Sequence, residues 1–514
     1  MVSVFILLVE IWLAAFFLKV AYRISPLHPL YQIPGPLLAK ATYFYEVYFD
    51  LIKGGQYTQE IQRLHDIYGP LIQINPEGLH SNDPRFIDEV YSGGTRKRNK
   101  PFLYLKFLVG CTGQDHNLHR KRREPLNKFF SKASVSKTEH DIHSLAQQLG
   151  DKMLAAATHR KVFQFQDAVS CYTADVIGLF AFGDELGFLQ QHGFVPNLKR
   201  ASWPLFTTYY MCRWLDPVRF CFENFGAYVS RFMPKDLATY QNLLDVEIPS
   251  RISQIKAERD AAIIRKRQTA FDVLLDSSLL EHEKSDKRLQ GEAGLFLIAG
   301  TDTTSWTLTV ATFYLLQNSV LLAELTAELL TVVKDPRNLP RWSTLEQLPL
   351  LGGVVHEALR LGYGVPGRSP RIATHEDLIY RGFWTAPGAT EPSEVAHVIP
   401  RGFNVGMSTL LLHHNEEVFP DSEEFLPERW LNEDGSRRKD LERFLFSFSK
   451  GSRGCLGKNL AYCEIYLALV VLVLRVFPRM QLYQTTIDDV KLVRDLLVPV
   501  IKDGRKGVQV LITD

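Results

Sequence analysis

The sequence predicts a mainly α-helical protein with small β-sheets, and three observations indicate this class. Apolar residues recur with helical spacing through most of residues 134–330. Strand-like runs are short and fall in two regions, 71–81 and 378–407. A composition of 46% hydrophobic residues, with 32 Phe and 20 Tyr among 514 residues, supplies a large core. Because no repeat or second linker divides the chain beyond residue 40, we expect one domain over 40–514.

The first 23 residues predict a membrane anchor. Val2 to Leu18 is almost wholly apolar, and with the residues that follow it reaches roughly the length of a bilayer span. No small-residue cleavage site follows cleanly, which favours an uncleaved anchor over a removed signal peptide. Lys19 and Arg23 on its C-terminal flank predict a single-pass topology with the rest of the chain in the cytosol. Glu10 implies a partner or a shallow, tilted insertion.

A proline-rich segment, residues 24–39, follows this anchor. It contains Pro26, Pro29, Pro34 and Pro36. Proline fixes φ and resists helix formation, so the segment predicts a semi-rigid hinge between anchor and body.

The body starts with a predicted amphipathic helix over 56–68, which Gly69 and Pro70 end. Other elements follow from hydrophobic periodicity. They are strands over 71–75, 78–81, 378–380 and 397–407, and a helix from Leu456 onward.

Charge and cysteine usage exclude several classes of function. A net charge of +2 with only short basic clusters gives no reason to expect a nucleic-acid partner. Six cysteines are scattered without a C-x-x-C pair, which suits a reducing compartment and argues against a structural zinc site.

The segment from Phe448 to Gly457 carries the strongest chemical signal. Cys455 lies on a glycine-flanked loop before a predicted helix, where helix N–H groups favour a thiolate that can bind a metal. Gly451 and Gly457 lack Cβ atoms and would let a large flat cofactor approach, while Arg453 could pair with a carboxylate. A buried structural cysteine on a glycine turn is the alternative.

A second signal lies in the apolar run 291–316, which contains Ala299, Gly300, Asp302 and Thr303. Glycine in a helix interior costs roughly 1 kcal/mol relative to alanine, so its presence asks for a reason. A Thr hydroxyl that bonds to the carbonyl four residues earlier would open the helix locally. An acid beside an alcohol could then relay protons; a satisfied polar pocket or a helix N-terminus is the alternative.

These two segments resemble motifs of cytochromes P450. Residues 448–457 match the heme-binding pattern F-x-x-G-x-R-x-C-x-G at every fixed position, and residues 299–303 match A/G-G-x-D/E-T. The resemblance implies the P450 fold and heme b, with Cys455 as the iron ligand. It further implies that Asp302 and Thr303 serve oxygen activation.

Other residues match the same family. Glu357, Arg360 and Arg429 resemble the structural E-x-x-R and P-E-R-F set, with Trp430 replacing the phenylalanine. The resemblance implies that they hold the cysteine loop and are not catalytic. His119 and Arg123, together with Arg371, match positions that bind heme propionates. Further basic residues could form a face that steers an acidic electron donor, namely Arg120, Lys121, Arg122, Lys450 and Lys458.

The chain departs from the family at Trp384 to Ala396, a Pro-, Thr- and Glu-rich stretch that predicts an inserted surface loop or translated non-coding sequence. Residues 363–371 and 460–464 are similar to fungal enzymes of secondary metabolism, of which trichodiene-oxygenase-like members are the nearest suggestion.

The resemblance implies an endoplasmic-reticulum monooxygenase that inserts one oxygen atom from O2 into an apolar terpenoid or polyketide. Because few residues follow Cys455, electrons are expected from NADPH–cytochrome P450 reductase. Residues 202–225, dense in Trp, Phe and Tyr, predict a lipid-facing entrance or ordinary core packing. An isomerase or peroxygenase of the same fold, and a non-catalytic membrane heme carrier or sensor, stay open as alternatives.

Overall fold

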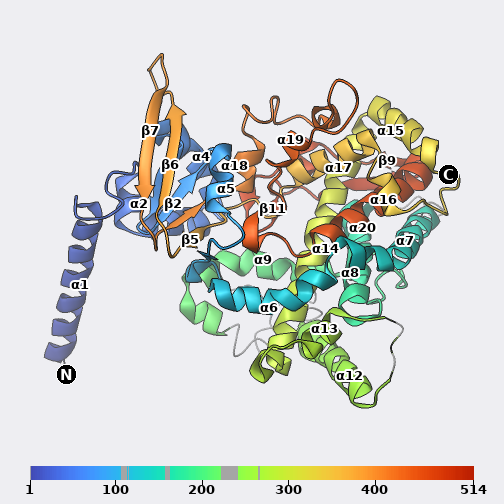
Figure 1. The fold of residues 1–514 in the computed structure, drawn as a ribbon, viewed down its shortest axis with the longest axis horizontal. Coiled ribbons are helices and arrows are strands. Elements are labelled where there is room, and N and C mark those ends of the chain that lie inside the picture. Colours follow the sequence, from blue (N-terminus) through green and yellow to red (C-terminus); the bar gives the residue numbers. More distant parts are fainter. Residues whose placement is uncertain are drawn as a thin grey trace.

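The computed structural model describes residues 2–105, 113, 115–156, 162–221, 241–263, 265 and 267–513, and it confirms a mainly helical body with small sheets (Figure 1). The longer helices of the body are α4 (Tyr57–Tyr68), α6 (His116–Phe129), α7 (Lys132–Ala155), α8 (Phe165–Phe182), α9 (Leu198–Trp214), α12 (Ile248–Asp260), α14 (Asp286–Gln317), α15 (Ser319–Val332), α17 (Pro349–Gly362) and α20 (Lys458–Val471). Shorter ones are α2 (Leu37–Ala41), α3 (Phe44–Val47), α5 (Ile87–Val90), α13 (Ala270–Asp276), α16 (Trp342–Leu345), α18 (Thr409–His413) and α19 (Lys439–Glu442).

Helix α14 passes through the middle of the body and organises the main core (Figure 1). It packs against α8, α17 and α20, and from Thr304 to Phe313 every side chain is buried. A helix that is apolar nearly all round is stable only when other elements enclose it. The sequence therefore places its longest body helix at the centre, where one stretch of it can face a cavity.

The sheets are small and antiparallel for the most part. The largest has the strand order β1-β2-β8-β5-β3, and the others pair β6 with β7, β10 with β11, and β4-β12-β9. Their bounds are β1 (Leu71–Asn75), β2 (Gly78–Ser81), β3 (Arg98–Asn99), β4 (Phe163–Gln164), β5 (Arg371–Ala373), β6 (Leu378–Trp384), β7 (Ser393–Ile399), β8 (Asn404–Gly406), β9 (Met480–Leu482), β10 (Arg494–Asp495), β11 (Pro499–Val500) and β12 (Gln509–Ile512). The strand predicted over 397–407 is two strands, because the chain turns at Pro400–Phe403.

The prediction of an inserted loop over 384–396 is wrong in its extent. β6 and β7 form one antiparallel ladder in register from Leu378↔Ile399 to Trp384↔Ser393, so only residues 385–392 form the connection. The extra residues therefore lengthen a hairpin and leave its strand pairing intact.

Helix α1 (Val2–Ile24) extends away from the body (Figure 1). Among the described residues two helices are long and apolar enough to cross a membrane, or up to three if the bent pair α14–α15 counts as one span. Val4–Ile24 has a mean hydropathy of 2.3 with none of it buried, whereas Lys458–Arg479 is 78% buried. The second helix belongs to the core, which leaves α1 as the candidate anchor.

The segment 24–39 differs from the spacer that its prolines predict. Leu30, Ile33 and Ala39 are buried, and the first two join the apolar cluster under the largest sheet. The carbonyl of Pro34 also accepts a hydrogen bond of 2.7 Å from Gln73 N–H at the edge of that sheet. Prolines here set a path along the body that lets apolar side chains pack, so this segment is part of the fold.

Two truncations are expected to separate anchoring from folding. Removal of residues 2–21, which keeps Arg23 and its hydrogen bond to the Ala41 carbonyl, should move the protein from the membrane fraction to the soluble fraction with an unchanged melting temperature. Removal of residues 2–41 should also lower the melting temperature, because each fully buried large apolar side chain contributes about 1.5–3 kcal/mol. Equal melting temperatures for both variants would contradict the packing of the proline-rich segment.

Candidate functional site

Cys455 lies on a short turn that leads into α20. Its N–H donates to the Phe448 carbonyl at 2.8 Å, and the Gly454 N–H donates to the Gly451 carbonyl at 3.0 Å. Ser449 and Gly451 have positive φ values of 53° and 67°, which fold the chain back on itself. Backbone hydrogen bonds therefore fix the direction of the cysteine side chain.

The two glycines of this turn have different roles. A Cβ on Gly451 would lie 2.0 Å from the Tyr91 carbonyl oxygen, and Gly451 does not line the cavity beside Cys455. The prediction that it admits a cofactor is therefore wrong, because close approach of another backbone and a positive φ explain this glycine. Gly457 does line the cavity, and a Cβ there would meet no atom within 4 Å.

The Cys455 thiol is exposed only in the sense that it lines this cavity. Surrounding protein desolvates it and raises its pKa, while the backbone N–H groups of Gly457 and Lys458 and the charge of Arg123 act in the opposite direction. The helix N-terminus alone is thus insufficient to ionise the thiol. A bound metal cation reverses that balance, because a coordinating thiol is deprotonated outright.

The Glu357 carboxylate is the centre of a fully buried ion network. Arg360 binds it through two hydrogen bonds, Nε to Oε2 at 2.9 Å and Nη2 to Oε1 at 2.7 Å, and both side chains are 0% exposed. Arg429 Nε and the Leu426 N–H also donate to Oε1, at 3.0 and 2.9 Å. Trp430 Nε1 donates to Oε2 at 2.8 Å, a bond that a phenylalanine at this position could not make.

This network reaches the cysteine turn through two connections. Arg360 Nη1 donates to the His413 carbonyl at 2.9 Å, and His413 Nε2 accepts the Phe446 N–H at 2.8 Å. Ser447 Oγ donates to the Leu359 carbonyl at 2.7 Å, on the same helix as the ion pair. The two residues before Phe448 are therefore tied to α17, which supports the predicted structural role of the set.

Helix α14 presents Ala299, Gly300 and Thr303 to the cavity that Cys455 lines. Thr303 Oγ1 donates to the Ala299 carbonyl at 2.8 Å, as its position predicts. The helix is nevertheless continuous from Asp286 to Gln317, so the expected opening is absent from it. Gly300 has a packing reason as well, since a Cβ there would lie 2.8 Å from Ile177 Cγ1 on α8.

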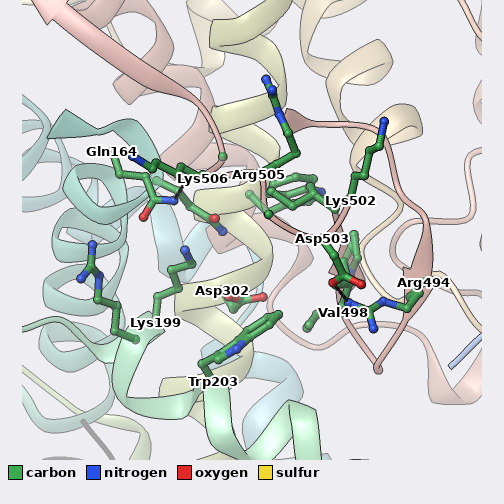
Figure 2. Close-up of a pocket in the computed structure, with 18 residues that line it drawn as sticks. Gln164, Lys199, Trp203, Asp302, Arg494, Val498, Lys502, Asp503, Arg505 and Lys506 are labelled. Carbon is green, nitrogen blue, oxygen red and sulfur yellow. Dashed lines mark hydrogen bonds and ion pairs between the residues drawn. The ribbon is translucent and has the colours of Figure 1, made fainter. Parts of the chain in front are cut away.

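Asp302 does not line that cavity. Its carboxyl faces a second hollow of about 340 Å³, where it lies among Lys199, Trp203 and the 498–507 loop (Figure 2). Burial raises the pKa of Asp302 to about 6, and the nearby Lys199 ammonium opposes that shift. The predicted acid–alcohol pair is therefore split between two hollows, one on each side of α14.

The cavity between Cys455 and Thr303 has a volume of about 390 Å³ and carries basic groups at one side. His119, Arg123, Arg371 and Arg453 all line it, as predicted for residues that bind carboxylates. Burial and the charges of Arg453 and Arg123 lower the pKa of His119 to about 2, so its imidazole is neutral. The arginines supply the positive charge.

These residues fit a heme. The cavity offers one thiol, apolar walls that include Phe448 and Phe130, and arginines that match two carboxylates. Among the described residues no group of three or more His, Cys, Asp or Glu side chains could hold a bare metal ion. A cavity with a single thiol among its lining residues suits an iron that a macrocycle already coordinates.

Sequence reasoning missed several residues of the site. Lys100 and Arg368 line the cavity, and His413 connects the ion network to the cysteine turn. Arg368 lies three residues before the predicted site residue Arg371, and this closeness in the sequence was a visible signal that it belongs to the site. Its role became apparent only from its neighbours in space.

Comparison with known proteins agrees with this geometry. A family model described as cytochrome P450 matches residues 41–482. The chain is similar to the cytochrome P450 monooxygenase ppzE of Metarhizium majus, with 40% identity over 86% of this chain and 94% of the relative. It is also 34% identical to tpcC of Cochliobolus heterostrophus, over 96% of this chain and 94% of the relative. Identity to TRI4 of Trichoderma arundinaceum is 33%, over 94% and 90% of the two chains.

The thiol cavity and the helical fold define the heme-thiolate class. The chain belongs to the cytochrome P450 family and is a cytochrome P450 monooxygenase, as its fold, its family match and its named relatives agree in showing.

Substitution of Glu357 by Gln should strongly destabilise the protein. It leaves Arg360 buried without its counter-charge, and breaking a buried ion pair costs about 3–5 kcal/mol. Trp430→Phe should cost about 1–3 kcal/mol through one lost hydrogen bond to a charged acceptor. Denaturant unfolding measures both, with the exposed Glu428→Gln as the control. Equal stabilities for Glu357→Gln and Glu428→Gln would contradict the role of the network.

Proposed function

We propose that this enzyme inserts one oxygen atom from O2 into an apolar small molecule, with heme b held by Cys455. The observation that carries the proposal is that Cys455 and Thr303 line the same cavity, one on the turn before α20 and the other on α14. A metal-binding thiol and an alcohol in one cavity suit oxygen chemistry better than storage of a cofactor.

The residues divide the work between binding and proton handling. Cys455 would bind the heme iron, and Arg123, Arg371, Arg453 and His119 would hold the carboxylate groups of the heme. Gly457, Phe448, Ala299 and Gly300 would face the macrocycle. Thiolate-ligated heme iron supplies the oxygen activation itself, since the thiolate pushes electron density that favours O–O cleavage. The chain's own part is to orient substrate and to place a hydroxyl, Thr303 Oγ1, in the cavity.

Asp302 would supply protons to the hydroxyl side of α14 from the second hollow. Its buried carboxyl is protonated near and below pH 6, and it borders a space lined by polar side chains that water can enter. Because its neighbour Thr303 faces the other cavity, transfer between them requires a rotation of the carboxyl or an intervening water.

An external electron donor and a membrane location complete the proposal. Arg120, Lys121 and Lys458 are exposed, whereas Arg122 pairs with Glu283 at 2.8 Å, so part of the predicted basic face is available for an acidic partner. NADPH–cytochrome P450 reductase would be that partner. Helix α1 would anchor the enzyme in the endoplasmic reticulum as a single span with the body in the cytosol.

The substrate class follows from the relatives and the cavity. One relative, 34% identical over 96% of this chain and 96% of its own length, is named conidiogenone synthase, from Penicillium rubens. The others named here are fungal monooxygenases. We therefore propose that the enzyme acts in fungal secondary metabolism on an apolar terpenoid or polyketide scaffold, in keeping with the apolar residues that line much of the cavity.

Thr303→Ala should retain heme but lose most product formation. The reductant consumed should be diverted to peroxide, because the cavity hydroxyl that handles protons is gone. The matched control is Thr309→Ala, which removes the same kind of bond to a helix carbonyl, Ser305 O at 2.7 Å, outside the cavity. Product per reductant consumed is measured for both. Unchanged product formation in Thr303→Ala would favour the isomerase or peroxygenase alternatives, and a wild type that binds heme but forms no product would favour the carrier.

The pH dependence of product formation should report on Asp302. Its raised pKa of about 6 means that the carboxyl holds its proton below that pH and loses it above, so a proton-limited rate should fall as pH rises through about 6. Lys199→Gln should move the inflection to higher pH, since the ammonium favours the ionised carboxyl. Asp302→Asn should abolish the inflection. A pH profile that is identical in all three proteins would exclude Asp302 as the donor.

A further inference from the structure

The second hollow, which Asp302 faces, is lined by more basic than acidic side chains (Figure 2). Two acidic residues, Asp302 and Asp503, line it together with six basic ones, namely Lys199, Arg200, Arg494, Lys502, Arg505 and Lys506. A hollow with an excess of one charge concentrates small ions of the opposite charge, unless neighbouring groups already neutralise it.

Most of these cations are neutralised or solvated. Four of them have carboxylate partners, in the pairs Arg200–Asp167 (2.5 Å), Lys502–Asp488 (2.9 Å), Arg494–Asp503 and Arg505–Asp489. Lys506 is exposed, so water solvates its charge. These five side chains therefore do not call for a bound anion.

Lys199, near the start of α9, differs from them. Among the described residues its ammonium donates no hydrogen bond and forms no ion pair. The residue is partly buried, yet Nζ is not among the unpartnered side-chain atoms that the fold seals off, and Figure 2 shows the side chain pointing into the second hollow. Burial lowers the pKa of Lys199, while the carboxyls of Asp167 and Asp302 oppose that shift without bonding to the ammonium. An anionic ligand would stabilise an accessible, partly desolvated cation of this kind.

A second hydrogen-bond donor lines the same hollow. Gln166, in the first turn of α8, is only 8% exposed. Its side-chain amide forms no hydrogen bond within the described part of the chain, and neither amide atom is sealed off. A buried amide is unfavourable unless something bonds to it. Together with the Lys199 ammonium, its N–H group offers donors that suit an oxyanion.

Much of the remaining wall is apolar. Trp203 and Trp306 line the second hollow together with Val498 and Val500, and Trp203 is 38% exposed. Inorganic phosphate would leave these side chains in contact with water, whereas the body of an organic anion would cover them. One unpaired, partly buried ammonium matches a single negative charge, and the volume of about 340 Å³ suits a small molecule.

We propose that the second hollow binds a small organic carboxylate, with its oxygens on Lys199 Nζ and the Gln166 amide and its apolar part against Trp203 and Trp306. The inference goes beyond the proposed function and does not depend on it, because binding here involves no step at the heme. Ionised Asp302 faces the same hollow, so its charge opposes the ligand that Lys199 attracts. Loss of these two charges is therefore expected to change affinity in opposite directions.

Calorimetric titration of the ferric holoenzyme tests the site with three probes: 3-phenylpropanoate, its neutral amide, and inorganic phosphate. Saturating 4-phenylimidazole, whose binding at the heme is followed optically, keeps the probes out of the cavity that Cys455 lines. We expect the carboxylate to bind about tenfold more tightly than the amide, as a charge-assisted hydrogen bond implies, and more tightly than phosphate. No measurable binding of the carboxylate, or equal affinity for it and either other probe, would overturn the proposal.

Matched variants separate this site from general attraction by charge. Lys199→Gln should weaken carboxylate binding about tenfold, and Gln166→Leu should also weaken it, because each removes one donor. Asp302→Asn should strengthen it. The control is Lys502→Gln, which makes the same change of charge at an exposed residue of the hollow that Asp488 already neutralises, and it should keep the wild-type affinity.

The melting temperature and optical spectrum of each variant show whether it is folded. If Lys199→Gln does not fold, the opposite changes expected for Gln166→Leu and Asp302→Asn carry the test. Unchanged affinity in folded Lys199→Gln, an equal loss in Lys199→Gln and Lys502→Gln, or changes of the same sign in Gln166→Leu and Asp302→Asn would each contradict the carboxylate site.

Discussion

The burial of the Glu357 carboxylate is the constraint on which the site depends. A carboxylate with no access to water must receive hydrogen bonds at both oxygens, and here Arg360, Arg429 and Trp430 supply them from two segments. Arg360 in turn donates a hydrogen bond to the His413 carbonyl, and the His413 ring accepts one from the Phe446 N–H. These linked hydrogen bonds position the turn that presents Cys455. The turn is therefore held rigid by the ion network around Glu357, which lies away from the thiol.

Helix α14 separates the two hollows that Thr303 and Asp302 face, and the proposed proton transfer would have to connect them. Adjacent residues on a helix point about 100° apart, and here that rotation turns Asp302 away from the cavity that Thr303 lines. Thr303 faces the apolar cavity with the thiol, while Asp302 faces a hollow bordered by Lys199 and the 498–507 loop. This arrangement keeps the Asp302 carboxyl out of the cavity that Cys455 lines. In the proposed function, protons would enter from water in the second hollow.

The fold class and the thiol turn could be predicted from sequence, because both rest on local patterns: helical periodicity, and fixed residues within ten positions around Cys455. The direction of Asp302 could not, since tertiary packing of α14 decides which face meets the cavity. Gly451 was assigned to a cofactor although the Tyr91 carbonyl explains it. The prolines of residues 24–39 predict a spacer, because the apolar side chains that pack against this segment lie on strands distant in sequence. Arg368 joins groups from residues 46 to 368, which no local pattern reveals.

The central claim is that Cys455 is the side chain that binds a heme iron held in the cavity between α14 and α20. X-ray absorption at the iron edge of the purified holoenzyme tests it most directly, because it reports which atoms surround the metal. We expect one sulfur in the first shell of the wild type, and none in Cys455→Ser, with the remaining ligands those of a macrocycle. A first shell without sulfur in the wild type, or one that keeps its sulfur after the substitution, would contradict the assignment.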